Sequence, residues 1–457
     1  MAAPPSAPPR RRPRAPPGRF EREHAGCWPW GHLLGWRGPS GFGSRATARD
    51  VVRAYLAASP RGGGGALRGR TAIVTGGNAG IGLATAEALA RAGLRVVLAC
   101  RDPAAAERAA EKIRAKILRR GEEVEAARPQ GEANDAAAAA ASAAAAAASE
   151  SSSVVAFPAP LDLASFASVR AFAARVLAEL PTLHVLVHNA GVMPSRFRVT
   201  EDGHEATFQV NVLAPVLLTH LLTPLLIARG ASENHDHAPP RRVVFVASAA
   251  HRYAYARGSD EALDRTLRVV TNLCDTRGEK QGVFAEGGDF FGNRREIFGK
   301  NQKTTRGDDA RRRSTLDDAL KAHDPVRAYG FSKFAQIALA PLLNARFRAL
   351  RPSPDSPPVT CDAAHPGAVL TAGSERARRD VSGWRGAAVH AIGRPFLKTP
   401  EGGAATVVHA CLRQGAGDGG GRYFVNCNVA RPERRAARSG AARRLWEAAE
   451  AATKKSA

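Results

Sequence analysis

A glycine-rich turn between an apolar run and a helical stretch is the feature that most limits the fold of this chain. Residues 75–82 read Thr-Gly-Gly-Asn-Ala-Gly-Ile-Gly and follow the apolar run at 71–75. Gly76 suits a tight turn, Gly80 lets a ligand approach the backbone, and Gly82 permits close packing of helix against strand. The free N–H groups at the start of such a helix bind phosphates, so the turn predicts a dinucleotide site. The alternative, a purely structural turn, is disfavoured by the strand–turn–helix context.

Further apolar runs recur along the chain and alternate with helical segments. Continuous apolar runs are typical of parallel strands that are buried on both faces. Their alternation with helices predicts an α/β fold with a Rossmann-type, doubly wound parallel sheet. The predicted strands lie at 71–75, 96–100, 153–157, 184–188, 242–247 and 358–362.

The length of 457 residues would allow two or three domains, but low-complexity and charge-rich segments leave enough sequence for one. We expect a single Rossmann domain with surface insertions and tails that are at least partly disordered. The expected parts are a basic, proline-rich N-terminal tail or transit segment at 1–66, the domain at 67–430 with insertions at 121–152 and 252–323, and a basic C-terminal helix or tail at 431–457.

The formal net charge is +24, and the excess is concentrated in 1–20, 290–313 and 431–455. Such a charge favours polyanions or anionic membrane surfaces. No aromatic-spaced basic motif or recognition-helix pattern accompanies it, so we expect no specific nucleic-acid partner. Peripheral membrane association stays open.

The six cysteines show no C-x-x-C spacing, which predicts a reducing compartment, no disulfide framework and no metal site. We expect no transmembrane helix, because no apolar run reaches ~18 residues; the stretch 212–228 is expected to be a buried helix. The N-terminus lacks the apolar core of a secretory signal. Its arginine-rich, acid-poor composition fits an organelle transit peptide or a disordered tail, so the expected location is an organelle or otherwise the cytoplasm.

The end of the second predicted strand bears on the choice of cofactor. An acidic side chain there would take the ribose hydroxyls of NAD(H), whereas Arg101 can meet the 2′-phosphate of NADP(H). Asp102, followed by Pro103, is expected to cap a helix. These residues favour NADP(H), with NAD(H) as the alternative, in which Arg101 is an ordinary surface arginine.

Several motifs occur in the order found in the short-chain dehydrogenase/reductase family, which the chain resembles over 68–430, insertions aside. Each motif alone would be weak, but the ordered set is specific, and it implies an NADP(H)-dependent oxidoreductase that interconverts a carbonyl and an alcohol. The motifs are TGGNAGIG at 75–82, Asp162 in LDL, Asn189-Ala190-Gly191, Asn211, Ser248, Tyr329-x-x-x-Lys333 and Pro366-Gly367.

The resemblance implies roles for four catalytic residues. Tyr329 exchanges a proton with the substrate oxygen, and Lys333, on the same helical face, holds the nicotinamide ribose. Ser248 hydrogen-bonds the substrate oxygen, and Asn211 anchors a water that relays protons. We expect Lys333 and the nicotinamide charge to lower the phenol pKa from its usual ~10. The implied cofactor-binding residues are Gly76, Asn78, Ala79, Gly80, Ile81, Gly82, Arg101, Asp162, Leu163, Asn189, Ala190, Gly191, Tyr329, Lys333, Pro366, Gly367, Val369 and Thr371.

Finer features are similar to the retinol dehydrogenase/WW-domain oxidoreductase group, among them VVLACRD, HNAGVM, TEDGHEATFQVN and YFVNCN. The stretch GPSGFG at 38–43 is most similar to plant short-chain dehydrogenases associated with the plastid inner-envelope translocon. This kinship implies a small, lipophilic carbonyl or alcohol substrate and favours a plastid. The alternative is an NADPH-binding, redox-sensing or scaffolding subunit of a membrane-associated complex, with little turnover.

The chain also departs from the family pattern. Tyr329 follows Ser248 by 81 residues, so the insertion enters beside the substrate pocket, either as a lid or as a disordered excursion. Gln336 stands where the family has asparagine. The basic stretch 431–455 is expected to be a helix docked through Trp446, with a calmodulin-like or membrane partner as the alternative. A homodimer is also left open.

Overall fold

The computed structural model describes residues 37–58, 67–126, 154–228, 241–254, 260–271, 324–353, 356, 358–370, 397–413 and 419–454. These residues form one eight-stranded sheet with the order β3-β2-β1-β4-β5-β6-β7-β8. The strands are β1 (Thr71–Thr75), β2 (Arg95–Ala99), β3 (Val154–Ala156), β4 (Val185–His188), β5 (Arg241–Val246), β6 (Val359–His365), β7 (Tyr423–Val425) and β8 (Asn428–Ala430).

All six predicted strands are confirmed, and the Rossmann-type parallel sheet with them. Strands β1 to β7 pair in parallel, and the order reverses between β1 and β4. Such a switch point places ligands outside the carboxyl ends of the strands. One correction concerns the far edge, where β8 is antiparallel to β7. Asn426 and Cys427 join these strands with positive φ angles of 50° and 63°, as a two-residue hairpin turn requires.

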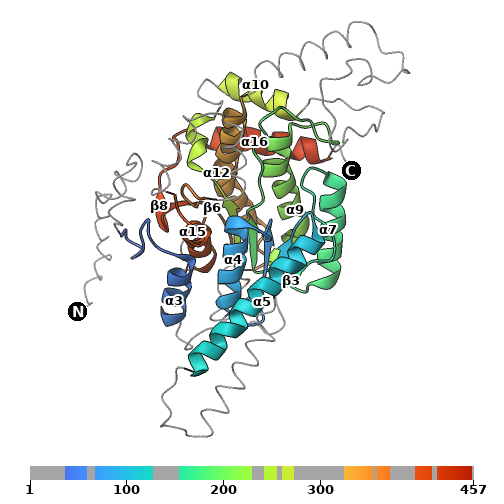
Figure 1. The fold of residues 1–457 in the computed structure, drawn as a ribbon. Coiled ribbons are helices and arrows are strands. Elements are labelled where there is room, and N and C mark those ends of the chain that lie inside the picture. Colours follow the sequence, from blue (N-terminus) through green and yellow to red (C-terminus); the bar gives the residue numbers. More distant parts are fainter. Residues whose placement is uncertain are drawn as a thin grey trace, which may run out of the picture.

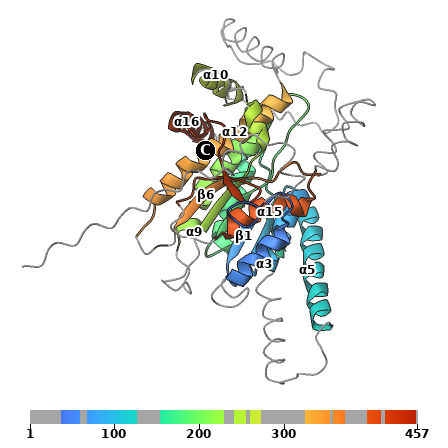
Figure 2. The ribbon, with the colours of Figure 1, turned by 90° about the vertical axis from the view of Figure 1, so that its left-hand side faces the viewer.

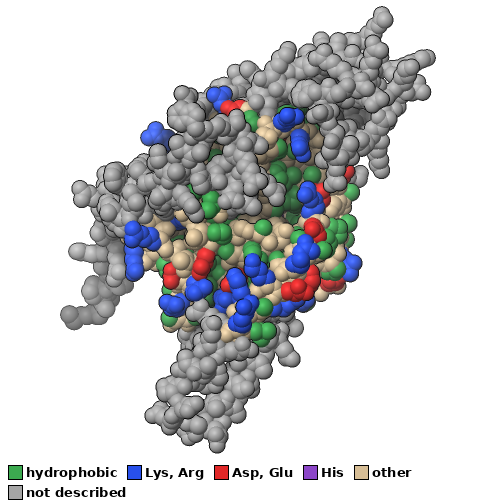
Figure 3. All heavy atoms as spheres, in the orientation of Figure 1, with side chains coloured by type: hydrophobic (Ala, Val, Ile, Leu, Met, Phe, Trp, Pro, Cys, Tyr) green, Lys and Arg blue, Asp and Glu red, His purple; other side chains and the backbone are tan. Residues whose placement is uncertain are grey.

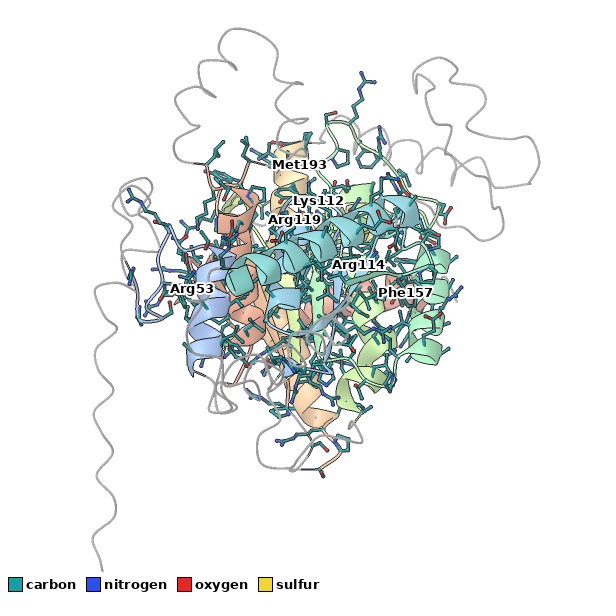
Figure 4. All side chains as sticks on the ribbon, turned by 60° about the horizontal axis from the view of Figure 1, so that its bottom comes forward. Arg53, Lys112, Arg114, Arg119, Phe157 and Met193 are labelled. Atoms are coloured by element: carbon teal, nitrogen blue, oxygen red, sulfur yellow. The ribbon has the colours of Figure 1, made fainter. Side chains whose placement is uncertain are left out.

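Helices cover both faces of the sheet (Figures 1 and 2). One layer contains α3 (Ala48–Ala58), α4 (Gly80–Arg91), α5 (Pro103–Ala126) and α15 (Pro400–Leu412); the other contains α7 (Phe166–Glu179), α9 (Ala214–Ile227) and α12 (Pro325–Ala349). Each layer encloses its own apolar cluster, because strands buried on both faces present side chains alternately to the two layers. On the edge strand β3, Arg114 of α5 donates to the carbonyl of Val154 at 2.7 Å (Figure 4).

The folded unit begins before residue 67, the expected boundary between tail and domain. Helix α3 packs against α4 and α15, with Val51 and Val52 buried. Upstream of it, the amide N–H of Ser40 donates to Oδ1 of Asn428 at 3.0 Å, and Nδ2 of Asn428 donates to the carbonyl of Phe42 at 3.1 Å. The segment that contains Ser40 and Phe42 is thus hydrogen-bonded to the last strand, β8. Residues 1–36 and 59–66 lie outside the described residues.

Parts of both predicted insertions are described. The first begins inside a helix, since α5 continues to Ala126, and 127–153 lie outside the described residues. The second contains the end of η3 (Ala249–Tyr253) and the amphipathic helix α10 (Asp260–Thr271); 255–259 and 272–323 lie outside. Leu263 and Leu267 of α10 are buried.

The C-terminal segment forms α16 (Ser439–Lys454), which packs against α10 and α12. Leu445 and Trp446 are buried, and the guanidinium of Arg346 lies 4.1 Å from the centroid of the Trp446 ring. The prediction of a helix docked through Trp446 is therefore confirmed.

Among the described residues, one helical run, Ala206–Ile227, is long and apolar enough to cross a membrane, with a mean hydropathy of 1.9. It comprises α8 (Ala206–Phe208), η2 (Gln209–Leu213) and α9. About three quarters of its most apolar part is buried inside the protein, as expected for a core helix. The predicted buried helix at 212–228 lies in this run.

Candidate active site

The predicted site residues gather at the carboxyl edge of the sheet, because the parallel strands end there side by side. The glycine turn follows β1, Asn189 follows β4, Ser248 follows β5, and Pro366 follows β6. The buried members are Gly82, Leu163, Asn211, Lys333 and Pro366; the half-buried members are Gly76, Asn78, Gly80, Ile81, Asp162, Asn189, Ala190, Ser248, Tyr329, Gly367 and Val369; Ala79, Arg101 and Gly191 are exposed. Thr371 lies outside the described residues.

The glycine turn has the backbone that its sequence predicts. Gly76 and Gly80 adopt positive φ angles of 63° and 53°, which side-chain-bearing residues rarely adopt. A Cβ atom on Gly82 would lie 2.3 Å from the carbonyl oxygen of Gly76, so helix α4 can approach the turn this closely only with glycine there.

The first turn of α4 is suited to an anion. Its N-cap residue is Ala79, which supplies no side-chain hydrogen bond to the free N–H groups of the helix. Those N–H groups and the helix dipole favour a phosphate. The residues present therefore fit the pyrophosphate of a dinucleotide.

Thr75, which the sequence analysis did not assign to the site, fastens the turn to the neighbouring strand. Its hydroxyl accepts hydrogen bonds from the amides of Asn189 and Ala190, each at 3.0 Å. Nδ2 of Asn189 in turn donates to the carbonyls of Thr75 at 3.0 Å and Gly76 at 3.2 Å. Asn189 thus stabilises the turn, and its place on the floor of a cofactor site stays a prediction.

At the end of β2, Arg101 is exposed and no ion pair joins it to another described residue. Asp102 accepts a hydrogen bond from the amide of Ala105 at 3.1 Å, which confirms that it caps α5. Asp162 is engaged locally, since its carboxylate accepts from the amide of Ala164 at 2.9 Å. The side chain of Leu163 belongs to the apolar core, so only its main chain could face a cofactor.

Tyr329 and Ser248 lie together although they are 81 positions apart in the sequence. The side chain of Ser248 lies beside the phenol of Tyr329 and acts to lower its pKa. Helix α12 and η3 can approach this closely because Gly330 has no side chain: a Cβ there would lie 2.5 Å from the carbonyl oxygen of Ala250. The insertion therefore leaves the two side chains next to each other.

The titratable groups of the site are shifted mainly by burial. Burial raises the pKa of Tyr329, and the side chain of Ser248 opposes that rise. Burial also lowers the pKa of Lys333 to about 7. The expected lowering of the phenol pKa by Lys333 is therefore not seen in the structure, because desolvation of the phenolate is the larger effect.

Lys333 is held by two acceptors. Its Nζ donates to the carbonyl of Val246 at 2.8 Å and to Oε1 of Gln336 at 3.1 Å. The ammonium also lies 5.3 Å from the centroid of the Tyr329 ring, one helical turn away. Phenol and amine therefore share one face of α12, as the spacing predicted.

Asn211 lies in a π-helical turn, η2, with no exposed surface. Its side chain accepts from the amide of Val192 at 2.8 Å and donates to the carbonyl of Val192 at 3.0 Å and to Oγ of Ser332 at 2.9 Å. The Asn211 side chain therefore clamps the segment after Gly191 to the Tyr–Lys helix.

Behind the site, the segment after β6 contacts a buried lysine that the sequence analysis missed. Gly367 has a φ angle of 90°, and a Cβ there would lie 3.1 Å from the side chain of Lys398. Nζ of Lys398 donates to Oδ1 of Asn426 at 2.8 Å, and burial lowers its pKa to about 8. No spacing rule could have found it, because the contact joins separate loops. Over the described residues, no group of three or more His, Cys, Asp or Glu side chains is placed to hold a metal.

Comparison with known proteins agrees with this geometry. A family model described as short chain dehydrogenase matches residues 70–128 and 132–260. The human dehydrogenase/reductase SDR family member 13 is 35% identical over 391 residues, covering 86% of this chain and 75% of that protein. Mouse retinol dehydrogenase 12 is 28% identical over 83% of this chain and 85% of its own length. The chloroplastic short-chain dehydrogenase TIC 32 A of Brassica napus is 27% identical over 92% of this chain and 96% of its own.

Proposed function

Because the chain belongs to the short-chain dehydrogenase family, we propose that it is an NADP(H)-dependent oxidoreductase that interconverts a carbonyl and an alcohol on a small, lipophilic substrate. The observation that carries the proposal is the convergence of Ser248, Tyr329 and Lys333 at the carboxyl edge of the sheet. The glycine turn at 75–82, which would be the cradle for the cofactor, lies at this same edge, so cofactor and proton donor would meet there.

Tyr329 serves as the proton donor in the direction of reduction. Its raised pKa keeps the phenol protonated at neutral pH, and the Ser248 hydroxyl beside it binds the same substrate oxygen. A nicotinamide bound at the cradle would supply the hydride and, when oxidised, a positive charge that favours the phenolate. The ammonium of Lys333 also favours the phenolate in the reverse direction.

Two residues support NADP(H) over NAD(H). Arg101 presents an exposed guanidinium at the end of β2, where the adenosine ribose of a bound dinucleotide would lie, and no ion pair joins it to another described residue. Asp102, the nearest acidic side chain in the sequence, is occupied as the cap of α5. Arg101 could therefore bind the 2′-phosphate of NADP(H). Asp102 is not available to bind the ribose hydroxyls of NAD(H), because it caps α5.

A lipophilic substrate is supported by apolar side chains that are exposed next to the catalytic residues. Val192 and Met193 follow Gly191, Tyr253 ends η3, and Val326 lies one helical turn before Tyr329; each is at least 39% exposed. Figure 3 shows hydrophobic side chains gathered in a hollow above the middle of the described surface, with Lys and Arg side chains both above and below it. Clustered exposed apolar groups are typical of binding sites.

The chloroplastic relative supports a plastid location, and the retinol dehydrogenase supports the substrate class. Neither bears on oligomeric state or membrane association. A homodimer, a peripheral membrane contact and a partner for 431–455 are separate proposals from the enzyme activity.

The test is NADPH oxidation against a panel of apolar aldehydes and ketones, with Tyr329→Phe as the matched variant. We expect turnover by the wild type and a loss of about 10³-fold or more in the variant, with NADPH binding retained. Equal turnover by both proteins would reject the role of Tyr329. NADPH binding without turnover by the wild type would favour the sensing or scaffolding alternative.

A further inference from the structure

Gln336 links two residues of the proposed catalytic set. It lies on α12 three residues after Lys333, on the same helical face, and is buried. Its Oε1 accepts from Nζ of Lys333 at 3.1 Å, and its Nε2 donates to the main-chain carbonyl of Asn211 at 2.7 Å. One side-chain amide therefore joins the amine to the π-helical turn.

The local sequence removes one helical donor from the carbonyl of Asn211. In an α-helix it would accept the N–H of the residue four positions later, which is Pro215 and has no N–H. The π-turn at 209–213 shifts the bonding pattern, so that the amide of Ala214 donates to the carbonyl of Gln209. A buried carbonyl without a partner is unfavourable, and Gln336 satisfies it.

Lys333 needs the acceptor for a different reason. A buried ammonium has three N–H donors, each of which is costly to leave unpaired. The carbonyl of Val246 and Oε1 of Gln336 take two of them within the described structure. Both acceptors are neutral, the ring of Tyr329 faces the amine, and burial is the cause that shifts the pKa of Lys333.

Resting on the proposed function, we propose that Gln336 is a positioning residue that fixes the ammonium of Lys333 between β5 and the turn of Asn211, so that one N–H remains for the cofactor. The glutamine uses its two ends for different partners: the oxygen orients the amine, and the nitrogen holds the backbone of the turn. A hydrophobic residue of equal size would do neither.

Three variants separate these contacts. Gln336→Met keeps the volume and removes both hydrogen bonds. Gln336→Glu keeps an acceptor for Lys333 but places a carboxylate against the carbonyl of Asn211. Leu339→Met, a buried position on the same helix, controls for a change in core packing.

The first readout is the titration of Lys333 by NMR of ¹³C-labelled lysine, in protein without added cofactor. The pKa of Lys333, which burial lowers to about 7, should fall by about one unit in Gln336→Met and rise by at least about one unit in Gln336→Glu. Leu339→Met should match the wild type. Unchanged midpoints in both Gln336 variants would overturn the proposal.

The second readout is turnover at saturating NADPH. We expect kcat to fall about tenfold or more in Gln336→Met, with the dissociation constant for NADPH changed less than about threefold. A wild-type kcat in a Met variant whose melting temperature alone has dropped would show a merely structural role. If the wild type itself turns over no carbonyl substrate, the proposed function fails, while the NMR titration still decides whether Gln336 controls the amine.

Discussion

The carbonyl oxygen of Ser248 accepts a hydrogen bond from Nδ1 of His251 at 2.7 Å. Because a carbonyl can only accept, Nδ1 must carry the proton, and Nε2 is then free to accept from the amide of Glu433 at 3.2 Å. The ring is buried, and burial lowers its pKa, which favours this neutral form. His251 thereby connects the serine of the candidate site to the segment that leads into α16.

His251→Leu should therefore impair the site. Both hydrogen bonds are lost, so we expect kcat to fall about tenfold and the melting temperature to drop by several degrees. His251→Asn keeps a donor that can reach the carbonyl of Ser248, and it should retain most of the kcat while losing the link to Glu433. Steady-state kinetics and thermal unfolding check both variants; a Leu variant with the kcat of the wild type would show that the link is unimportant for the site.

Lys333 should make stability depend on pH. Its folded pKa of about 7 lies below the value of 10.5 for the free side chain. Between those values the unfolded chain binds the additional proton, so the free energy of unfolding rises as the pH rises. Relative to Lys333→Met, the wild type should gain about 2–3 kcal/mol between pH 7 and pH 9.5. Urea unfolding across this range measures the difference, and parallel curves for the two proteins would contradict the burial of a charged amine.

Gly82→Ala should disrupt the cradle. The added Cβ would lie 2.3 Å from the carbonyl oxygen of Gly76. Because both atoms are attached directly to the backbone, a side-chain rotation cannot relieve this clash. We expect NADPH affinity to fall about 100-fold, with a loss of stability of roughly 1–3 kcal/mol. Gly440→Ala is the matched control, since a Cβ there meets nothing within 4 Å and the position is helical. Retention of NADPH affinity by the Gly82 variant would argue against a dinucleotide at this turn.

Arg101→Gln should alter the choice of cofactor. If the guanidinium binds the 2′-phosphate, its removal should weaken NADPH about 10- to 100-fold and leave NADH almost unchanged. Binding titrations with both cofactors give the ratio directly. Equal weakening of NADPH and NADH would instead indicate a general effect on the fold of the turn.

Much of this protein could be predicted from the sequence because the relevant signals are local. The six parallel strands follow from apolar runs that are buried on both faces, and the turn at Gly76 and Gly80 follows from a backbone that only glycine adopts readily. Tyr329 and Lys333 are four residues apart, and this spacing places them on one face of a helix. The hairpin β7–β8 and helix α3 were not predicted, because both lie outside the alternating series of apolar runs and helical segments on which the prediction rested.

Contacts between segments that are distant in the sequence, and the pKa shifts caused by burial, were decided by the tertiary structure. The meeting of Ser248 with Tyr329 depends on how α12 packs against η3, and the partner of Asn428 lies more than 380 residues away, near the start of the described chain. The direction of the shifts at Tyr329 and Lys333 was also set by burial, which belongs to the packed molecule and not to neighbours along the chain. Desolvation and packing act between segments that are distant in sequence, so residues such as Gln336 and His251 acquire their partners only when the chain has folded.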